Sequence, residues 1–317
     1  FFMIRHLCTT QRDRERLFVG LGFGALFVAI IGIAQWITRF GIPTPCDIER
    51  RITSVFPYPN AVGLFLGPVI VIATGMLIHA RHTWRTTIFW ITTLVTSLIA
   101  IVLAKSEASW VAVLASVFLL SITHKPARRY AIVVASVLLV MIATIVPIRE
   151  VVTNKLLLRD YSGGVRLSQW SEAWTFLKDH PLMGAGLSGY PTAIKPYHVR
   201  KEFEIFQYPH QLFLNVWVEM GVLGLLAWTL LDLIVIKTVW LSRRLPIVLI
   251  IGFTLLEMMI HGLVDVAYFK NDLAVMTWIL IALLLNTHTE PTASGRGTDR
   301  LDTLQTVTKA APQNESA

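Results

Sequence analysis

Eight runs of apolar residues, separated by polar segments, dominate the pattern along the 317-residue chain. Each run has about 16 to 26 residues, enough for a helix to cross or nearly cross a bilayer. Backbone polar groups in hydrocarbon must be satisfied within the segment, so each run is predicted to be a helix. The runs cover residues 17–38, 61–80, 86–104, 108–123, 130–147, 211–236, 245–263 and 272–287.

The third and fourth runs are separated only by Lys105-Ser106-Glu107. They could form one long bent hydrophobic hairpin or two separate spans, and we predict two spans. The predicted fold is therefore all-α, a polytopic transmembrane helical bundle with about eight spans and one long extracytoplasmic loop.

Composition supports this fold class. Hydrophobic residues make up 54% of the chain and charged residues 15%, whereas soluble domains carry about 45–50% and about 25%. These values exclude a soluble enzyme, a disordered protein and a disulfide scaffold.

The net charge of +8 is explained by where the positive residues lie. With a cytoplasmic N-terminus, 15 Lys and Arg fall in cytoplasmic segments and five in short outer loops (Arg39, Arg50, Arg51, Lys105 and Lys270). This bias orients membrane proteins. We expect both termini in the cytoplasm, with the bilayer rather than nucleic acid as the partner of the basic residues.

The predicted organisation has five parts. A cytoplasmic N-terminal segment (1–16) precedes five transmembrane helices (17–147), and the extracytoplasmic loop (148–210) precedes three more (211–287). Residues 288–317 are polar without apolar periodicity and are predicted to be a disordered cytoplasmic tail.

The long loop contains a helical pattern. Apolar residues recur at helical spacing over 165–178, which predicts an amphipathic helix at the outer membrane interface. The apolar positions are Leu167, Trp170, Ala173, Trp174 and Leu177, and the other faces carry Arg166, Gln169, Glu172 and Lys178.

Glycines follow this helix. Gly184, Gly186 and Gly189 form a GxGxxG pattern, but a dinucleotide fold would need a preceding strand. We interpret the pattern as a tight loop that lets the backbone approach a neighbour or ligand.

Polar residues also lie beside or inside the apolar runs. His210 sits at the outer start of the sixth run, where it could anchor the helix or take a proton from a hydroxyl. Ionisable residues at membrane depth are functional candidates. Glu257, His261 and Asp265 are spaced i, i+4, i+8, which fits either an ion pathway or helix–helix hydrogen bonds.

Four sequence blocks show a family pattern. His210-Gln211 is followed after nine residues by Gly221-Val-Leu-Gly224. The other blocks are Tyr58-Pro59-Asn60-Ala61, Arg166-Leu-Ser-Gln-Trp170 with Pro181-Leu-Met-Gly184-Ala-Gly186, and His261-Gly-Leu-Val-Asp265. Taken in their order along the chain, the four blocks resemble the O-antigen ligase/polymerase (Wzy-type) family of bacterial polytopic membrane glycosyltransferases.

Two departures from the resemblance stand out. Relatives often have Ser-Arg-Gly where this chain has Ser106-Glu107-Ala108, and Lys105 could replace the missing arginine. Relatives also have more helices before the long loop, so we expect that roughly four helices precede this chain.

The resemblance implies a metal-independent transfer of a glycan, without a cofactor. The donor would be an undecaprenyl-pyrophosphate-linked glycan at the outer face of the inner membrane. The acceptor would be a hydroxyl of lipid A core, of another glycan or of a glycoprotein.

The resemblance also implies roles for individual residues. Arg166 would hold the pyrophosphate through bidentate hydrogen bonds, and His210 would take the acceptor proton. The other expected substrate-binding residues are Arg149, Arg159, Arg200, Lys105, Gly184, Gly186, Asn60 and Asp265. Other readings stay open: an O-antigen polymerase, a bicarbonate- or polysaccharide-related transporter, or a non-catalytic scaffold.

Overall fold

The computed structural model describes residues 1–80, 83–267 and 271–287 and contains helices and no strand within them. The predicted tail, 288–317, and the basic residues Arg81 and Lys270 lie outside the described residues. The all-α prediction is therefore confirmed for the part of the chain that the structure describes.

Each of the eight apolar runs forms its own helix. Five of these helices are long and apolar enough to cross a membrane, and the other three are shorter. The five are α2 (Gln11–Thr38), α3 (Pro59–His79), α4 (Trp84–Leu103), α6 (Lys125–Thr144) and α10 (Leu212–Ser242); the shorter three are α5 (Glu107–Thr123), α11 (Pro246–Gly262) and α12 (Asn271–Asn286).

Helix α3 lies at the centre of the bundle, packed against α2, α4, α5 and α11. Small residues allow this close packing, as is usual between membrane helices. A Cβ on Gly63 would lie 1.9 Å from the Ser109 hydroxyl of α5, and one on Gly67 would lie 2.2 Å from the Glu257 carboxylate of α11. The two glycines therefore fix how closely α5 and α11 approach α3.

A short helix, α1 (Phe2–Leu7), begins the chain and packs on α12. Asn286 near the end of α12 donates to the carbonyl oxygens of Ile4, Arg5 and Cys8. Helix α2 then begins at Gln11, six residues before its apolar run, with Thr10 and Asp13 forming a capping box.

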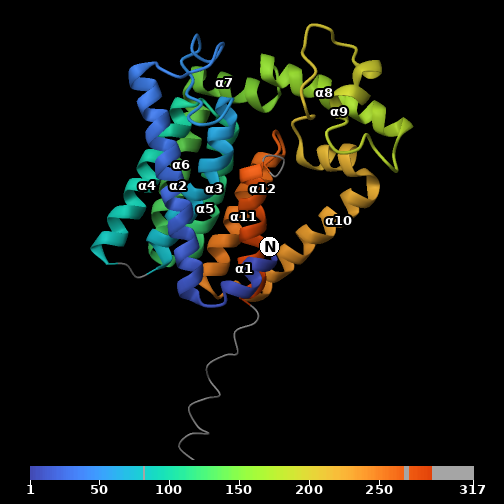
Figure 1. Ribbon diagram of the computed structural model, residues 1–317. Helices are drawn as coiled ribbons and strands as arrows, with labels where there is room; N and C mark the ends of the chain where they lie inside the picture. Colours follow the sequence, from blue (N-terminus) through green and yellow to red (C-terminus); the bar gives the residue numbers. More distant parts are fainter. Residues whose placement is uncertain (81–82, 268–270, 288–317) are drawn as a thin grey trace, which may run out of the picture.

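The polar segment between α6 and α10 folds at one end of the bundle, which we call the upper end (Figure 1). It contains α7 (Val146–Leu156), α8 (Tyr161–Asp179), α9 (Tyr190–Ala193) and a 3-10 turn, η1 (Lys195–Tyr197). Helices α7 and α8 run across the upper end, helices α2, α3, α5, α11 and α12 stand roughly upright, and α10 runs obliquely (Figure 1).

Helix α8 confirms the helix predicted over 165–178, but its faces differ from the prediction. Ala173 and Leu177 are buried, while Leu167 and Trp174 are 46% and 50% exposed. Gln169 and Glu172, expected on the outer faces, are buried instead. Apolar periodicity misplaced Glu172 because its buried partners, Ser168 and His198, are polar groups of the same segment.

Helix α10 is broken at Gly221, where φ is +67° and ψ is −173°. The break interrupts the helical hydrogen bond that would join the amide of Val222 to the carbonyl of Val218. The loop after α8 replaces both partners: Ala185 donates to Val218 O at 2.6 Å, and Val222 donates to Leu182 O at 3.1 Å. The two glycines of this loop, Gly184 and Gly186, have φ of +65° and +78°.

We expect Gly221→Ala to lower stability by about 1–3 kcal/mol, the typical cost of a strained backbone residue. A Cβ there would lie 2.1 Å from Leu182 O, so the 181–186 loop must also move. Thermal unfolding in detergent measures the effect. Gly20→Ala in α2 is the matched control, since a Cβ there meets nothing within 4 Å. Equal unfolding midpoints for the two variants would contradict this reading of the break.

Candidate active site

Three segments that are distant in sequence meet at the upper end. They are the first half of α8, the residues just before α10, and the turn after α11. Arg166 Nε donates to the carbonyl of Val264 at 3.0 Å, and His210 Nδ1 lies 3.5 Å from Asp265 Oδ1. Neighbouring residues of one turn thus bring together three of the predicted site residues, Arg166, His210 and Asp265.

The position of His210 is set by its backbone and its neighbours. Its φ is +48°, a left-handed conformation that non-glycine residues rarely adopt and that recurs at functional sites. The ring contacts the rings of Phe206 and Tyr208, with centroids 5.3 and 4.7 Å away. Gln211 caps α10 directly after it. The imidazole is therefore held between two aromatic rings at the start of the helix.

Asp265 stands behind His210 as a buried carboxylate. Its side chain is 2% exposed, and its Oδ1 accepts from the amide of Val266 at 2.8 Å. Nδ1 of His210 makes no hydrogen bond with the described residues, so the 3.5 Å contact is electrostatic. The carboxylate of Asp265 therefore faces the imidazole of His210 across this gap.

Two tyrosines extend the site toward α3. Tyr208 is 5% exposed and hydrogen-bonds with the side chains of Asp265 and Tyr58. Burial raises the pKa of Tyr208 above its ordinary value, and the charge of Asp265 and the Tyr58 hydroxyl raise it further. The Tyr208 hydroxyl therefore keeps its proton and can donate a hydrogen bond. Neither tyrosine was among the predicted site residues, although Tyr58 begins the Tyr58-Pro59-Asn60-Ala61 block and Tyr208 lies two residues before His210.

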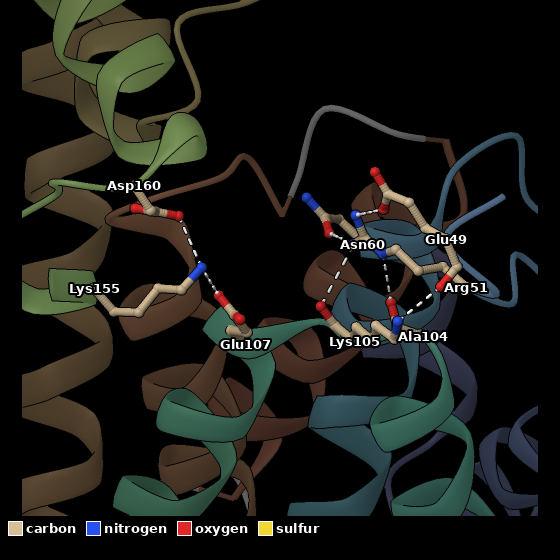
Figure 2. Close-up of polar contacts among 8 residues, drawn as sticks. All are labelled: Glu49, Arg51, Asn60, Ala104, Lys105, Glu107, Lys155 and Asp160. Carbon is tan, nitrogen blue, oxygen red and sulfur yellow. Dashed lines mark hydrogen bonds and ion pairs between the residues drawn. The ribbon is translucent and has the colours of Figure 1, made fainter. Parts of the chain in front are cut away.

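Asn60, two residues after Tyr58 at the start of α3, contacts the connection between α2 and α3 (Figure 2). Its Oδ1 accepts from Arg51 Nη2 at 3.0 Å, and Arg51 Nε donates to the carbonyl of Ala104 at 3.0 Å. Arg51 therefore fastens residues 39–58 to the α4–α5 turn and orients Asn60.

Lys105 of the α4–α5 turn, one of the expected substrate-binding residues, is exposed, and its ammonium contacts the connection before α3. Lys105 Nζ donates to the carbonyl of Glu49 at 2.7 Å (Figure 2). Within the described residues, no contact joins Lys105 to Arg166 or His210. A guanidinium that does contact this turn is that of Arg51, whose Nη2 donates to Asn60 Oδ1 and to the carbonyl of Lys105. Sequence proximity alone made Lys105 the expected replacement for the missing arginine.

Glu107 of the same turn binds the polar segment. Its carboxylate lies 2.6 Å from Lys155 Nζ of α7, which also contacts Asp160 at 2.8 Å (Figure 2). Asp160 caps α8 by accepting from the amide of Gly163. One ammonium group thus holds together α5, α7 and the start of the helix that carries Arg166.

We expect Lys155→Gln to loosen α7 while lowering stability by at most about 1 kcal/mol, because the pair is partly exposed. Hydrogen exchange of residues 146–164 measures the loosening, with Lys178→Gln as control. The role of Lys155 would be contradicted if exchange in Lys155→Gln were no faster than in the wild type, or if it were faster in Lys178→Gln as well.

The pH range of this contact follows from two pKa shifts. Burial raises the pKa of Asp160, but Lys155 outweighs it, and the net pKa falls below 3.8. Burial lowers the pKa of Lys155, but Asp160 and Glu107 outweigh it, and the net pKa rises above 10.5. The stabilisation by this contact is complete at pH values between the two ordinary pKa values. It is lost as the pH falls through the folded pKa of Asp160 or rises through that of Lys155.

The remaining expected cations lie at the surface. Arg149 and Arg159 are exposed. Arg200 pairs with Glu202 at 2.8 Å and stacks on Phe203. Contacts among the described residues connect none of the three with Arg166 or His210.

The buried acids of the bundle are arranged differently from the i, i+4, i+8 expectation. Glu257 and His261 lie on α11, 0% and 1% exposed, with 3.8 Å between Glu257 Oε1 and His261 Nδ1. Helix α11 ends at Gly262, so Asp265 lies beyond it and faces His210 instead. The three residues therefore do not share one helical face.

Comparison with known proteins gives one finding. A family model described as O-antigen ligase matches residues 92–229, a range that contains Arg166, Gly184, Gly186, His210 and the break at Gly221. The match thus covers two of the three segments that meet at the site. A search of curated proteins found no match.

Proposed function

We propose that the chain belongs to the O-antigen ligase (Wzy-type) family of multi-pass membrane proteins, whose model matches residues 92–229, and that it transfers a glycan from undecaprenyl pyrophosphate to a hydroxyl acceptor. The acceptor is lipid A core, another glycan or a protein. The observation that carries the proposal is the convergence of Arg166, His210 and Asp265 on one turn.

Arg166 is suited to hold the pyrophosphate. Its Nε is engaged by the carbonyl of Val264, and both Nη groups are without a hydrogen bond in the described structure. The fork of an arginine matches phosphate oxygens with two parallel, charge-assisted bonds. Negative charge grows on the pyrophosphate as it leaves, so such contacts strengthen in the transition state.

His210 is suited to accept the proton. In the reaction, the acceptor oxygen attacks the anomeric carbon, and the bond from that carbon to the pyrophosphate oxygen breaks. The bonding pair stays on undecaprenyl pyrophosphate, and the hydroxyl proton passes to His210, stabilised by Asp265. Attack opposite the leaving group inverts the anomeric centre.

We further propose that the upper end of the bundle faces the extracytoplasmic side of the inner membrane, with both termini in the cytoplasm. The Lys and Arg bias supports this orientation. It places the site where a lipid-linked glycan of the outer leaflet can reach it.

The test is a reconstitution of the protein in proteoliposomes that carry an undecaprenyl-pyrophosphate-linked saccharide. Each acceptor class is added outside, after protease mapping has identified vesicles whose 148–210 segment is external. We expect labelled saccharide to appear on one external acceptor. Modification of acceptor only when it is enclosed in the lumen of such vesicles would contradict a site at the end of the bundle that carries the 148–210 segment.

A further inference from the structure

The inner face of α8 carries three polar residues among its buried apolar ones. Ser168, Gln169 and Glu172 are 5%, 3% and 6% exposed. Ser168 donates its hydroxyl to Glu172 Oε1 at 2.7 Å. Burying three polar side chains on one helix costs free energy unless each has a hydrogen-bond partner. The partners of these side chains therefore bear on the role of this face.

His198 is the partner of Glu172. Its Nδ1 lies 3.1 and 3.2 Å from the two carboxylate oxygens, and the side chain is 9% exposed. A nitrogen in contact with both oxygens is the one that carries hydrogen. In the neutral ring, Nε2 then offers a lone pair, and it makes no hydrogen bond with the described residues.

Gln169 and Trp170 have no such partner. Both amide atoms of Gln169 and the indole Nε1 of Trp170 are buried without a hydrogen bond within the part of the chain that the structure describes. Unsatisfied buried groups of this kind are rare and call for a ligand or water. Trp170 and Arg166 are half-buried, so the polar face reaches the surface beside them.

The order of these groups along α8 matches that of a sugar pyrophosphate. At a rise of about 1.5 Å per residue, Gln169 lies about 4.5 Å and Glu172 about 9 Å along the axis from Arg166. A pyrophosphate at Arg166 would therefore place its sugar beside the amide of Gln169 and the Glu172–His198 pair.

We propose that Gln169 and the Glu172–His198 pair form the subsite for the sugar attached to the donor pyrophosphate. This inference rests on the proposed function. The amide of Gln169 bonds sugar oxygens, and Nε2 of His198 accepts from a hydroxyl. The carboxylate of Glu172 repels a second anion, so the subsite takes a neutral sugar in preference to a uronic acid.

Binding of defined lipids to the purified protein in nanodiscs tests the subsite. The probes are undecaprenyl pyrophosphate alone and the same lipid linked to N-acetylglucosamine, galactose or glucuronic acid. The variants are Gln169→Met and Glu172→Gln, which keep side-chain size, with Lys178→Gln as the exposed control on the same helix.

We expect at least one neutral sugar to tighten binding over the bare lipid. Each subsite variant should lose about tenfold of that gain, as for one or two lost hydrogen bonds. Binding of the bare lipid should stay unchanged in both variants and weaken in Arg166→Ala. That last measurement reports the proposed function separately.

Three results would overturn the subsite: no neutral sugar tightens binding, glucuronic acid binds as tightly as the neutral sugars, or both variants keep the full gain. Thermal unfolding of each variant identifies folded protein. If one variant fails to fold, the other still decides between these outcomes.

Discussion

We expect the His210→Ala variant to transfer glycan roughly 100- to 10,000-fold more slowly than the wild type, the usual contribution of a general base. The variant removes the only imidazole that faces Asp265 among the described contacts. The acceptor hydroxyl must then lose its proton to water. The loss should fall on the rate at saturating donor, because the proposed mechanism gives His210 the acceptor proton and Arg166 the pyrophosphate.

Single-turnover rates measure this prediction, with His180→Ala as the control. His180 is also in the polar segment, but it is exposed and stacks on Phe176. A His210→Ala protein that is folded and transfers at the wild-type rate would show that the imidazole only anchors the start of α10.

We expect Arg166→Ala to weaken the affinity for undecaprenyl pyrophosphate and to slow transfer roughly 100- to 1,000-fold, as for a lost transition-state donor. Arg166→Lys should recover little of the loss. A lysine keeps the charge but has neither the Nε that binds Val264 O nor the fork that meets two phosphate oxygens.

The control is Arg129→Ala, since Arg129 is exposed and contacts only its neighbour Tyr130. Binding of the lipid pyrophosphate and single-turnover rates are measured on each variant. Full recovery by lysine would mean that charge alone matters at position 166 and would contradict the bidentate role.

The apolar pattern predicted the helices well because length and hydrophobicity alone decide which segments can cross a bilayer. The boundary between α4 and α5 followed from only three polar residues and was confirmed. The break in α10 was not foreseen, although Gly221 belongs to a recognised block. It depends on the loop at Leu182 to Ala185, which supplies the missing hydrogen bonds from a distant part of the sequence.

The site was predicted in part. Arg166, His210 and Asp265 stand in separate family-like blocks, and the structure brings them together. Lys105 was placed near the site only by its neighbours in sequence, and its side chain is turned to Glu49. The roles of Tyr58, Arg51 and Lys155 arise from contacts between elements, which periodicity and spacing do not report.

The polar residues buried on the inner face of α8 could also not be predicted from the sequence pattern. Gln169 and Glu172 were expected on outer faces because apolar residues define a buried stripe in an ordinary helix. Here a histidine 26 residues after Glu172 in sequence supplies the buried partner. Polar burial of this kind is visible only when the partner is placed, and it is the basis of the proposed sugar subsite.

The most direct test of the central claim is the release of undecaprenyl pyrophosphate from its saccharide in proteoliposomes, with and without acceptor. Wild type, Arg166→Ala and His210→Ala are compared at equal amounts of folded protein. We predict acceptor-dependent release by the wild type and loss of that release in both variants. No release by the wild type with any acceptor, or wild-type release by both variants, would contradict a glycan transfer at this site.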